Sequence, residues 1–539
     1  MAKNFLKSSL ENASLNIILQ ISFRIVTFIL NAFVIRHVSQ DAIGVMYVRL
    51  LLLESTILTL SRLAFRKACI SKTDTHNWPQ VINLIWLTVP LGVITSLIFG
   101  YIWLNVLSRP EDHVTQHYTF GVISIAASCV IEMCSDSLYL VSQAFLFVKL
   151  RIFAELIQIF VRTVIFVLLI LKSAEHAVLA FSIAQLVSLM AYVVFFYVYF
   201  YWYIRANNRR RSEIKKDEGT DDFPFHSMVD FLPKRLQNSE QIDWKLLILT
   251  WSFMKQSVMM QILTEGERYV MTLINVLSFS EQGVFDVVNN LGSLAARFLF
   301  RPIEESAYFY FSQLIHRDVD IRKQNKSSMD EAAHVLENLL RCVSSLGLLV
   351  LFFGQSYAKM ALLLYGGRNL AFGLGAKLLK THCVAILLMA INGSTECYAL
   401  STMNTTELNK YNRIMIIFSV SFLIASWLFS SLLGSVGFIV ANCCNMLARI
   451  IYCSYFIKRR YKNTRYKPLF GLIPKIWFFI TLFVSAIVTF VSEVYLFDEH
   501  LIVHFFIGAV LFLITVASWM YQEKELVGML VQNWKKKRE

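Results

Sequence analysis

Apolar stretches of about twenty residues recur along the whole chain, separated by short polar breaks. A stretch of this length crosses a bilayer as an α-helix, because lipid offers the backbone no hydrogen-bonding partners. The pattern predicts an all-α polytopic membrane protein with about fourteen spans. The predicted spans are 12–36, 42–61, 80–107, 118–143, 147–171, 177–204, 247–277, 282–314, 331–364, 375–402, 408–432, 436–457, 473–496 and 501–521.

Composition agrees with a membrane protein, since 56% of the 539 residues are apolar and only 16% are charged. A soluble domain has roughly a quarter of its residues charged. The net charge of +14 comes mainly from loops on one side, where 34 of the 51 Lys and Arg residues lie, against 6 on the other side. Basic loops face the cytosol, so both termini are predicted to be cytosolic. Because the basic residues lie in loops beside spans, we expect no nucleic-acid partner.

A polar insert separates the first six predicted spans from the last eight. It covers 205–246, carries many charges of both signs and is expected to be a flexible cytosolic linker. The predicted domains are therefore an N-terminal six-helix bundle at 1–204 and a C-terminal six-helix bundle at 247–458. Two extra spans follow at 473–521, and a basic cytosolic tail occupies 522–539.

The two halves share short matching segments in the same order. A glycine–valine pair opens each segment, and each second span ends with the pattern Arg-x-x-Phe-Arg. The segments begin at Gly44 and Gly283, and the arginines are Arg62, Arg66, Arg297 and Arg301. Two related bundles would explain this order, although coincidence among Leu- and Phe-rich helices is an alternative explanation.

Six further segments resemble the eukaryotic Rft family. They are 30–33 (LNAF), 86–93 (WLTVPLGV), 261–271 (QILTEGERYVM), 288–294 (VNNLGSL), 302–306 (PIEES) and 434–439 (GSVGFI). The resemblance runs from about residue 15 to 520 and also agrees with the plan of the multidrug and oligosaccharidyl-lipid exporter superfamily, which has two six-helix bundles.

The resemblance implies that the chain moves a dolichol-pyrophosphate-linked oligosaccharide, Man5GlcNAc2, from the cytosolic to the lumenal leaflet of the endoplasmic reticulum for protein N-glycosylation. Two alternatives stay open. One is a non-transporting accessory factor of the same pathway, and the other is a multidrug exporter of the superfamily, which should have an anionic or aromatic cavity. Lys536 and Lys537, at positions −4 and −3 from the end, resemble a dilysine retrieval signal and also predict the endoplasmic reticulum membrane, although a generic basic anchor is an alternative.

Arginines inside spans are the best candidates for binding a pyrophosphate. A cation at this depth is costly and often marks a substrate path, and the planar guanidinium group matches phosphate oxygens. Arg24 and Arg268 are the first choice, because their spans would line the cleft between bundles in the superfamily plan. Alternatively, Arg268 only pairs with Glu265. The repeated arginines Arg62, Arg66, Arg297 and Arg301 extend the candidate set.

Other polar residues have supporting roles in this hypothesis. Glu265 and Glu267 would balance the arginines, while Asn31, Asn289 and Asn290 would face the sugars, unless they only link helices. No phosphate-binding Gly-rich motif, zinc motif or catalytic arrangement is legible, and the nine cysteines lack metal-ligand spacing. We therefore expect no enzyme activity, no cofactor and no metal; the sequence does not identify protein partners.

Overall fold

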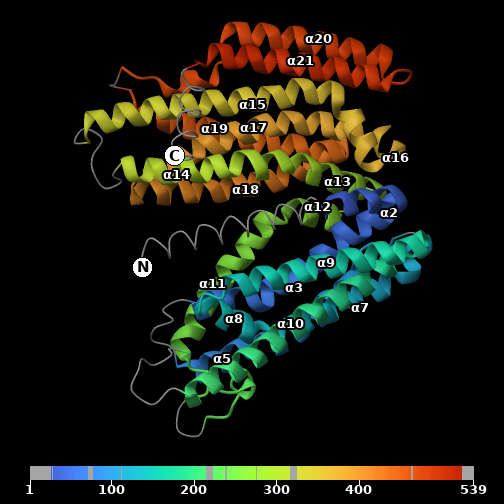
Figure 1. Ribbon diagram of the computed structural model, residues 1–539, viewed down its shortest axis with the longest axis vertical. Coiled ribbons are helices and arrows are strands. Elements are labelled where there is room, and N and C mark those ends of the chain that lie inside the picture. Colours follow the sequence, from blue (N-terminus) through green and yellow to red (C-terminus); the bar gives the residue numbers. More distant parts are fainter. Residues whose placement is uncertain are drawn as a thin grey trace. The chain divides into compact units, whose positions relative to one another are not determined.

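The computed structural model describes residues 26, 28–70, 77–110, 112–213, 223–236, 240–274, 276–315, 324–462 and 465–524. All regular elements of the described chain are helices (Figure 1). Eleven helical stretches there are long and apolar enough to cross a membrane, or twelve if one bent pair counts as a span. The chain is therefore an all-helical polytopic membrane protein, as its hydropathy predicts.

Two of the fourteen predicted spans are not among the candidate spans of the described structure. The predicted span 12–36 lies mostly outside the described residues, which include only a short apolar helix at Phe28–His37. The predicted span 282–314 is helical throughout as α13 (Phe279–Ala295), η7 (Ala296–Phe300) and α14 (Arg301–Leu314). Charged residues recur along this stretch, so hydropathy alone does not mark it as a span.

The chain forms two compact units, Met1–Gly283 and Val284–Glu539, and the division falls within α13. Two helices that follow the polar linker, α11 (Trp244–Thr264) and α12 (Gly266–Ile274), belong to the first unit. These units are defined by their internal contacts, whereas the predicted domains were defined by the repeated segments and the polar insert. The predicted boundary at 205–246 therefore stays a prediction.

The first long helical stretch among the described residues of this unit is Gln40–Ile70. It consists of α2 (Gln40–Ile43), η1 (Gly44–Leu50), α3 (Leu51–Leu58), η2 (Thr59–Leu63) and α4 (Ala64–Ile70). Both η1 and η2 are π-helical, and each wide turn carries an arginine, Arg49 or Arg62. Such π-helical turns are rare and frequently occur at functional sites.

The remaining helices of the first unit pack around this stretch. They are α5 (Trp78–Trp86), α6 (Thr88–Tyr101), η4 (Ile102–Val106), α7 (Asp112–Met133), α8 (Asp136–Ala144), α9 (Val148–Lys172), η5 (Ala174–His176) and α10 (Ala177–Glu213). Helix α10 packs against both α7 and α9, and the three run side by side (Figure 1). The predicted span 118–143 is broken, because α7 and α8 meet at an angle of 46°.

The expectation of a flexible linker is wrong for the part that the structure describes. Helix α10 continues to Glu213, and residues 223–236 fold against the bundle with the short helix η6 (Met228–Phe231). Phe223, Phe225 and Phe231 are buried in an aromatic cluster with side chains of α9 and α10. The segment does carry many charges, which favour a flexible chain. Its three buried aromatic side chains nevertheless supply enough apolar surface to hold it against the bundle.

Hydrogen bonds also hold the folded linker segment. Partial burial alone would raise the pKa of Asp230, but hydrogen bonds from Lys234 and from the backbone amides of His226 and Ser227 lower it below its ordinary value. The Asp230 carboxylate therefore stays charged and closes a capping box with Ser227 at the start of η6.

The second unit contains the longest helix, α15, among the described residues. After α14 come α15 (Lys326–Gly366), α16 (Arg368–Ala371), α17 (Leu374–Thr402), α18 (Thr405–Leu433), α19 (Ser435–Arg460), η9 (Pro468–Leu472), α20 (Ile476–Leu496) and α21 (Leu501–Gln522). Helices α20 and α21 pair with each other, and α20 packs on α15 (Figure 1).

Candidate functional site

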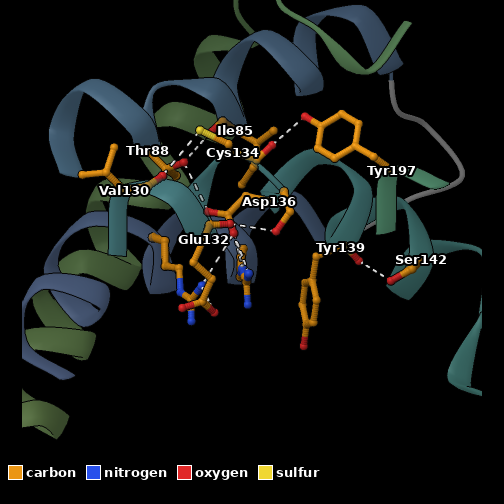
Figure 2. A network of polar contacts seen from close by, with 12 residues as sticks. Ile85, Thr88, Val130, Glu132, Cys134, Asp136, Tyr139, Ser142 and Tyr197 are labelled. Atoms are coloured by element: carbon orange, nitrogen blue, oxygen red, sulfur yellow. Dashed lines mark hydrogen bonds and ion pairs between the residues drawn. The ribbon is translucent and has the colours of Figure 1, made fainter. Parts of the chain in front are cut away.

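A group of buried ion pairs lies where α7 bends into α8 (Figure 2). Arg62 contacts Glu132 with 2.6 Å between Nη1 and Oε1, and also lies 3.8 Å from Asp136 Oδ1. Arg66 donates to the same Asp136 oxygen through Nη2, and through Nε at 3.1 Å. Only 1% of the Asp136 side chain and 9% of the Glu132 side chain are exposed.

The two carboxylates lie on either side of the helix break. Glu132 belongs to the last turn of α7 and Asp136 begins α8, and they contact the arginines of η2 and α4. Helix ends leave carbonyl groups without intrahelical partners, and Tyr197 satisfies one by donating to Cys134 O at 2.9 Å. Thr88 adds a hydrogen bond to Asp136 Oδ2 at 3.2 Å.

The charges of Arg62 and Arg66 are therefore already neutralised within the first unit. The Arg66 guanidinium also lies over the Tyr139 ring, 3.8 Å from its centroid. Buried charges of this kind are tolerated only when paired, and removal of one partner typically destabilises a protein by about 3–5 kcal/mol. To bind a pyrophosphate, these two arginines would have to exchange Glu132 and Asp136 for the ligand.

A second polar connection crosses the same unit. Gln185 on α10 donates to Glu54 Oε1 at 2.9 Å and accepts a hydrogen bond from Arg162 Nη1 at 3.3 Å. One amide thus joins a carboxylate on α3 to an arginine on α9. Sequence reasoning did not single out Gln185, although a glutamine inside an apolar span is a visible signal.

Arg268 lies just after the break between α11 and α12. Its Nη1 atom is 3.1 Å from Glu265 Oε2, and 28% of its side chain is exposed. Nearby, Tyr269 shares a hydrogen bond of 2.7 Å with Thr56, and Gln261 contacts Thr59 at 2.9 Å. These contacts join α11 and α12 to the helical stretch Gln40–Ile70, and the Arg268 side chain beside them stays partly exposed.

The other predicted phosphate-binding arginines differ in surroundings. Arg301 forms an ion pair with Glu305 at 3.0 Å, and 72% of its side chain is exposed. Arg297 lies in the π-helical turn η7, but its side chain is outside the described part, as is Arg24 altogether.

The supporting polar residues are also dispersed. Glu267 is half-buried at the start of α12, next to Arg268. Asn31 is exposed on the short helix Phe28–His37, and Asn289 is half-buried. Asn290 is exposed and donates to Asp286 Oδ2 at 2.8 Å. Their contacts with the sugars stay a prediction.

The second unit contains a group of polar residues that sequence reasoning did not assemble. Glu396 on α17 accepts hydrogen bonds from Tyr411 at 2.6 Å and from Asn392 at 3.1 Å. Arg449 on α19 lies 3.7 Å from the same carboxylate. The individual residues are visible in the sequence as polar positions inside spans, but their pairing depends on how three helices pack.

A further carboxylate was missed in the C-terminal pair of helices. Glu493 on α20 is buried and lies 2.8 Å from Lys380 Nζ and 3.6 Å from Lys359 Nζ. It joins the terminal pair to α17 and α15. The signal was available, because Glu493 is a charged residue inside an otherwise apolar predicted span.

Together, the fold and these buried ion pairs define a polytopic all-helical membrane protein with charged groups held inside its bundles. The model of the family described as Rft protein matches residues 8–533. The chain therefore belongs to the Rft family, as the resemblance of its segments suggested.

Curated relatives match over almost the whole length. The chain is similar to the Man(5)GlcNAc(2)-PP-dolichol translocation protein RFT1 of Drosophila melanogaster, with 44% identity over 98% of both chains. The protein of the same name from Xenopus tropicalis is 41% identical over 98% of this chain and 97% of its own. That from Mus musculus is 39% identical over 96% and 95%, respectively.

Two solved structures share the fold. One is the lipid II flippase MurJ in an inward closed conformation, with a TM-score of 0.59 and 14% identity over 94% of this chain and 99% of that chain. The other is an inward-facing multidrug resistance MATE family transporter of the MOP superfamily, with a TM-score of 0.51 and 12% identity over 81% and 96%. These likenesses concern the fold alone.

Proposed function

We propose that this chain is a flippase that moves dolichol-pyrophosphate-linked Man5GlcNAc2 from the cytosolic to the lumenal leaflet of the endoplasmic reticulum for N-glycosylation. The observation that carries the proposal is the similarity, 44% and 41% identity over 98% of this chain, to proteins that are named for translocation of this glycolipid. A fold shared with a lipid II flippase supports it, since that protein's name also refers to a lipid substrate.

The proposed architecture has fourteen transmembrane helices. It adds the predicted span 12–36 and the charged helical stretch Phe279–Leu314 to the candidate spans. Two pseudo-symmetric six-helix bundles and a C-terminal pair would then make up the chain. The distribution of basic loops supports cytosolic termini, and the glycolipid pathway supports the endoplasmic reticulum membrane as the location.

We propose Arg268 and Arg24 as the first ligands of the pyrophosphate, with Arg297 and Arg301 as further candidates. Partial exposure supports Arg268, because a ligand must reach the guanidinium group. Arg62 and Arg66 would join only by exchanging partners, so their role as direct ligands needs a rearrangement of their ion pairs. Glu265 and Glu267 would balance the arginines in the absence of the substrate.

Complementation tests the function and the first ligand together. In cells that lack their own family member, this chain should restore glycosylation of a secreted reporter, whereas Arg268→Ala should lower glycosylation at normal protein abundance. Arg268→Lys should restore it incompletely, because an ammonium group lacks the planar fork. Failure of the unaltered chain to complement would contradict the proposed function.

A double variant separates binding from simple charge balance. If Arg268 only neutralises Glu265, the combination Arg268→Gln with Glu265→Gln removes both charges and should restore activity. If Arg268 binds the pyrophosphate, the double variant should stay as impaired as Arg268→Gln alone. Normal activity of the double variant would therefore remove Arg268 from the site.

A further inference from the structure

A hollow of about 530 Å³ opens between the C-terminal turns of α10 and the folded linker segment. Its lining includes the basic side chains of Arg205, Arg209 and His226 together with Tyr201, Ile204 and Met228. The hollow thus combines basic side chains with an apolar wall. It is separate from the ion pairs of Arg62 and Arg66, which lie elsewhere in the first unit.

Hydrogen bonds between side chains and backbone groups hold the walls of the hollow in place. Asn208 Nδ2 donates to His226 O at 2.9 Å, which ties the linker to α10. The Asp230 carboxylate accepts from the His226 and Ser227 amides at 2.9 and 2.8 Å, and Phe225 and Phe231 of the same segment are buried. The hollow is therefore a built feature of the fold and does not need a ligand to form.

The basic side chains suit an anion. Arg205 and Arg209 are four residues apart, so they project from the same face of α10. Guanidinium groups bind phosphate oxygens through paired, charge-assisted hydrogen bonds. Basic residues also favour the C-terminal end of a helix and set topology, but neither effect requires them to line a hollow together.

An apolar stripe on α10 leads to the same place. Val187, Met190, Val194, Val198 and Tyr201 are 40–58% exposed and follow one another every three or four residues. This spacing places them on one helix face, which continues to Arg205 and Arg209. Exposed apolar side chains on a spanning helix contact acyl chains, and tyrosine is typical of the interface with the headgroups.

We propose that the hollow binds the headgroup of an anionic phospholipid, whose acyl chains lie along this stripe. The phosphate contacts the arginines, and the glycerol backbone lies against Tyr201 and Met228. In the proposed topology this is the cytosolic leaflet, where anionic lipids attract basic segments. The volume is in the range of small-molecule sites, about 300–1,000 Å³, which suits a glycerophosphate group.

Binding is tested on the purified full-length protein in mild detergent with a fluorescent short-chain phosphatidic acid. Arg205→Gln combined with Arg209→Gln should weaken binding about tenfold or more, because two charge-assisted contacts are lost. The matched control is Lys458→Gln with Arg459→Gln, which removes two exposed charges from the end of α19 and should leave binding unchanged. His226→Glu is a second test variant, since it adds a repelling charge without altering α10.

Competition identifies the kind of ligand. Unlabelled phosphatidic acid should displace the probe, whereas phosphatidylcholine and inorganic phosphate should displace it poorly at equal concentration. Equal competition by inorganic phosphate would make this a free-phosphate site, and stronger competition by a short polyisoprenyl pyrophosphate would assign it to the transported lipid; either result overturns the proposal. Unchanged binding by both test variants overturns it as well. The assay does not involve transport, so its outcome is independent of the proposed function.

Discussion

The Asp136 carboxylate contacts several side chains at once, so its replacement has a clear expected effect on stability. It accepts from Arg66 and Thr88 and lies within 3.8 Å of Arg62. Asp136→Asn should leave Arg66 as a buried charge without its full counter-charge, which typically costs about 3–5 kcal/mol. We expect a clearly lower thermal midpoint of the purified protein in detergent.

The pairing itself can be isolated by removing both charges. Arg66→Gln combined with Asp136→Asn should recover part of the lost stability, because no unpaired charge is left. Arg301→Gln is the comparison for an exposed pair, 72% and 69% exposed, and should cost no more than about 1 kcal/mol. Equal losses for Asp136→Asn and Arg301→Gln would contradict the account of a buried ion-pair group.

Gly44 illustrates what the sequence predicts about a residue and what it does not. The matching segments at Gly44 and Gly283 mark both glycines, but only the structure gives the reason. A Cβ atom on Gly44 would lie 2.0 Å from Phe279 O, and one on Gly283 would lie 2.3 Å from Gln40 O. Both glycines therefore permit a close backbone approach of α13 to the first helical stretch.

Gly44→Ala should destabilise the protein, because the atoms it meets belong to the backbone and cannot move aside cheaply. The control is Gly100→Ala on α6, where a Cβ atom meets nothing within 4 Å. That change should be neutral or slightly stabilising, since alanine favours a helix by about 0.5–1 kcal/mol over glycine. Thermal midpoints measured side by side check both; an unaffected Gly44→Ala protein would refute the close approach.

At the scale of elements, the hydropathy pattern predicts most spans well but not their internal breaks. Predicted spans such as 147–171 and 375–402 match α9 and α17 to within one residue at each end. The bend at Cys134 and Ser135 was not predicted, because a span of uniform hydropathy hides a local break. Hydropathy does not predict the π-helical turns at Arg49 and Arg62 either, because such a turn changes the backbone hydrogen bonds and not the apolar character of the span.

The phosphate-binding role of the predicted arginines stays a prediction, and what the structure adds is their protein partners. Arg62, Arg66 and Arg268 each lie in an ion pair. Arg268 and Glu265 are only three residues apart in the chain, so their pairing could be expected from the sequence. That Arg62 pairs with Glu132, 70 residues away, could not be derived from one sequence, because it depends on tertiary packing.

The C-terminal helix pair gives a prediction about one element. Glu493 joins α20 to Lys380 and Lys359, so Glu493→Gln leaves two lysines facing each other without a counter-charge. We expect faster hydrogen exchange in α20 and a loss of about 1–3 kcal/mol in stability. Glu499→Gln is the matched control, because this carboxylate is exposed six residues away; a similar effect of both changes would argue against the attachment.

At the scale of the whole molecule, the basic loops predict which positions face the cytosol. In a chain without its nine native cysteines, Thr220→Cys should react with an impermeant maleimide added outside sealed microsomes. Asp112→Cys should react only after the membrane is permeabilised. The opposite labelling pattern would contradict the proposed orientation and the cytosolic termini.

The central claim is that the chain itself moves the glycolipid, and purified protein reconstituted into liposomes tests it most directly. Radiolabelled dolichol-pyrophosphate-linked Man5GlcNAc2 is incorporated, and the fraction reached by an impermeant mannosidase is followed over time. We predict that the reachable fraction rises from about half toward completeness only in vesicles that contain the protein, since a bilayer holds a large polar headgroup in its leaflet. Arg268→Ala should slow this rise. A reachable fraction no higher than in protein-free liposomes, for a preparation that restores glycosylation in cells, would contradict the claim and leave the chain as an accessory factor of the pathway.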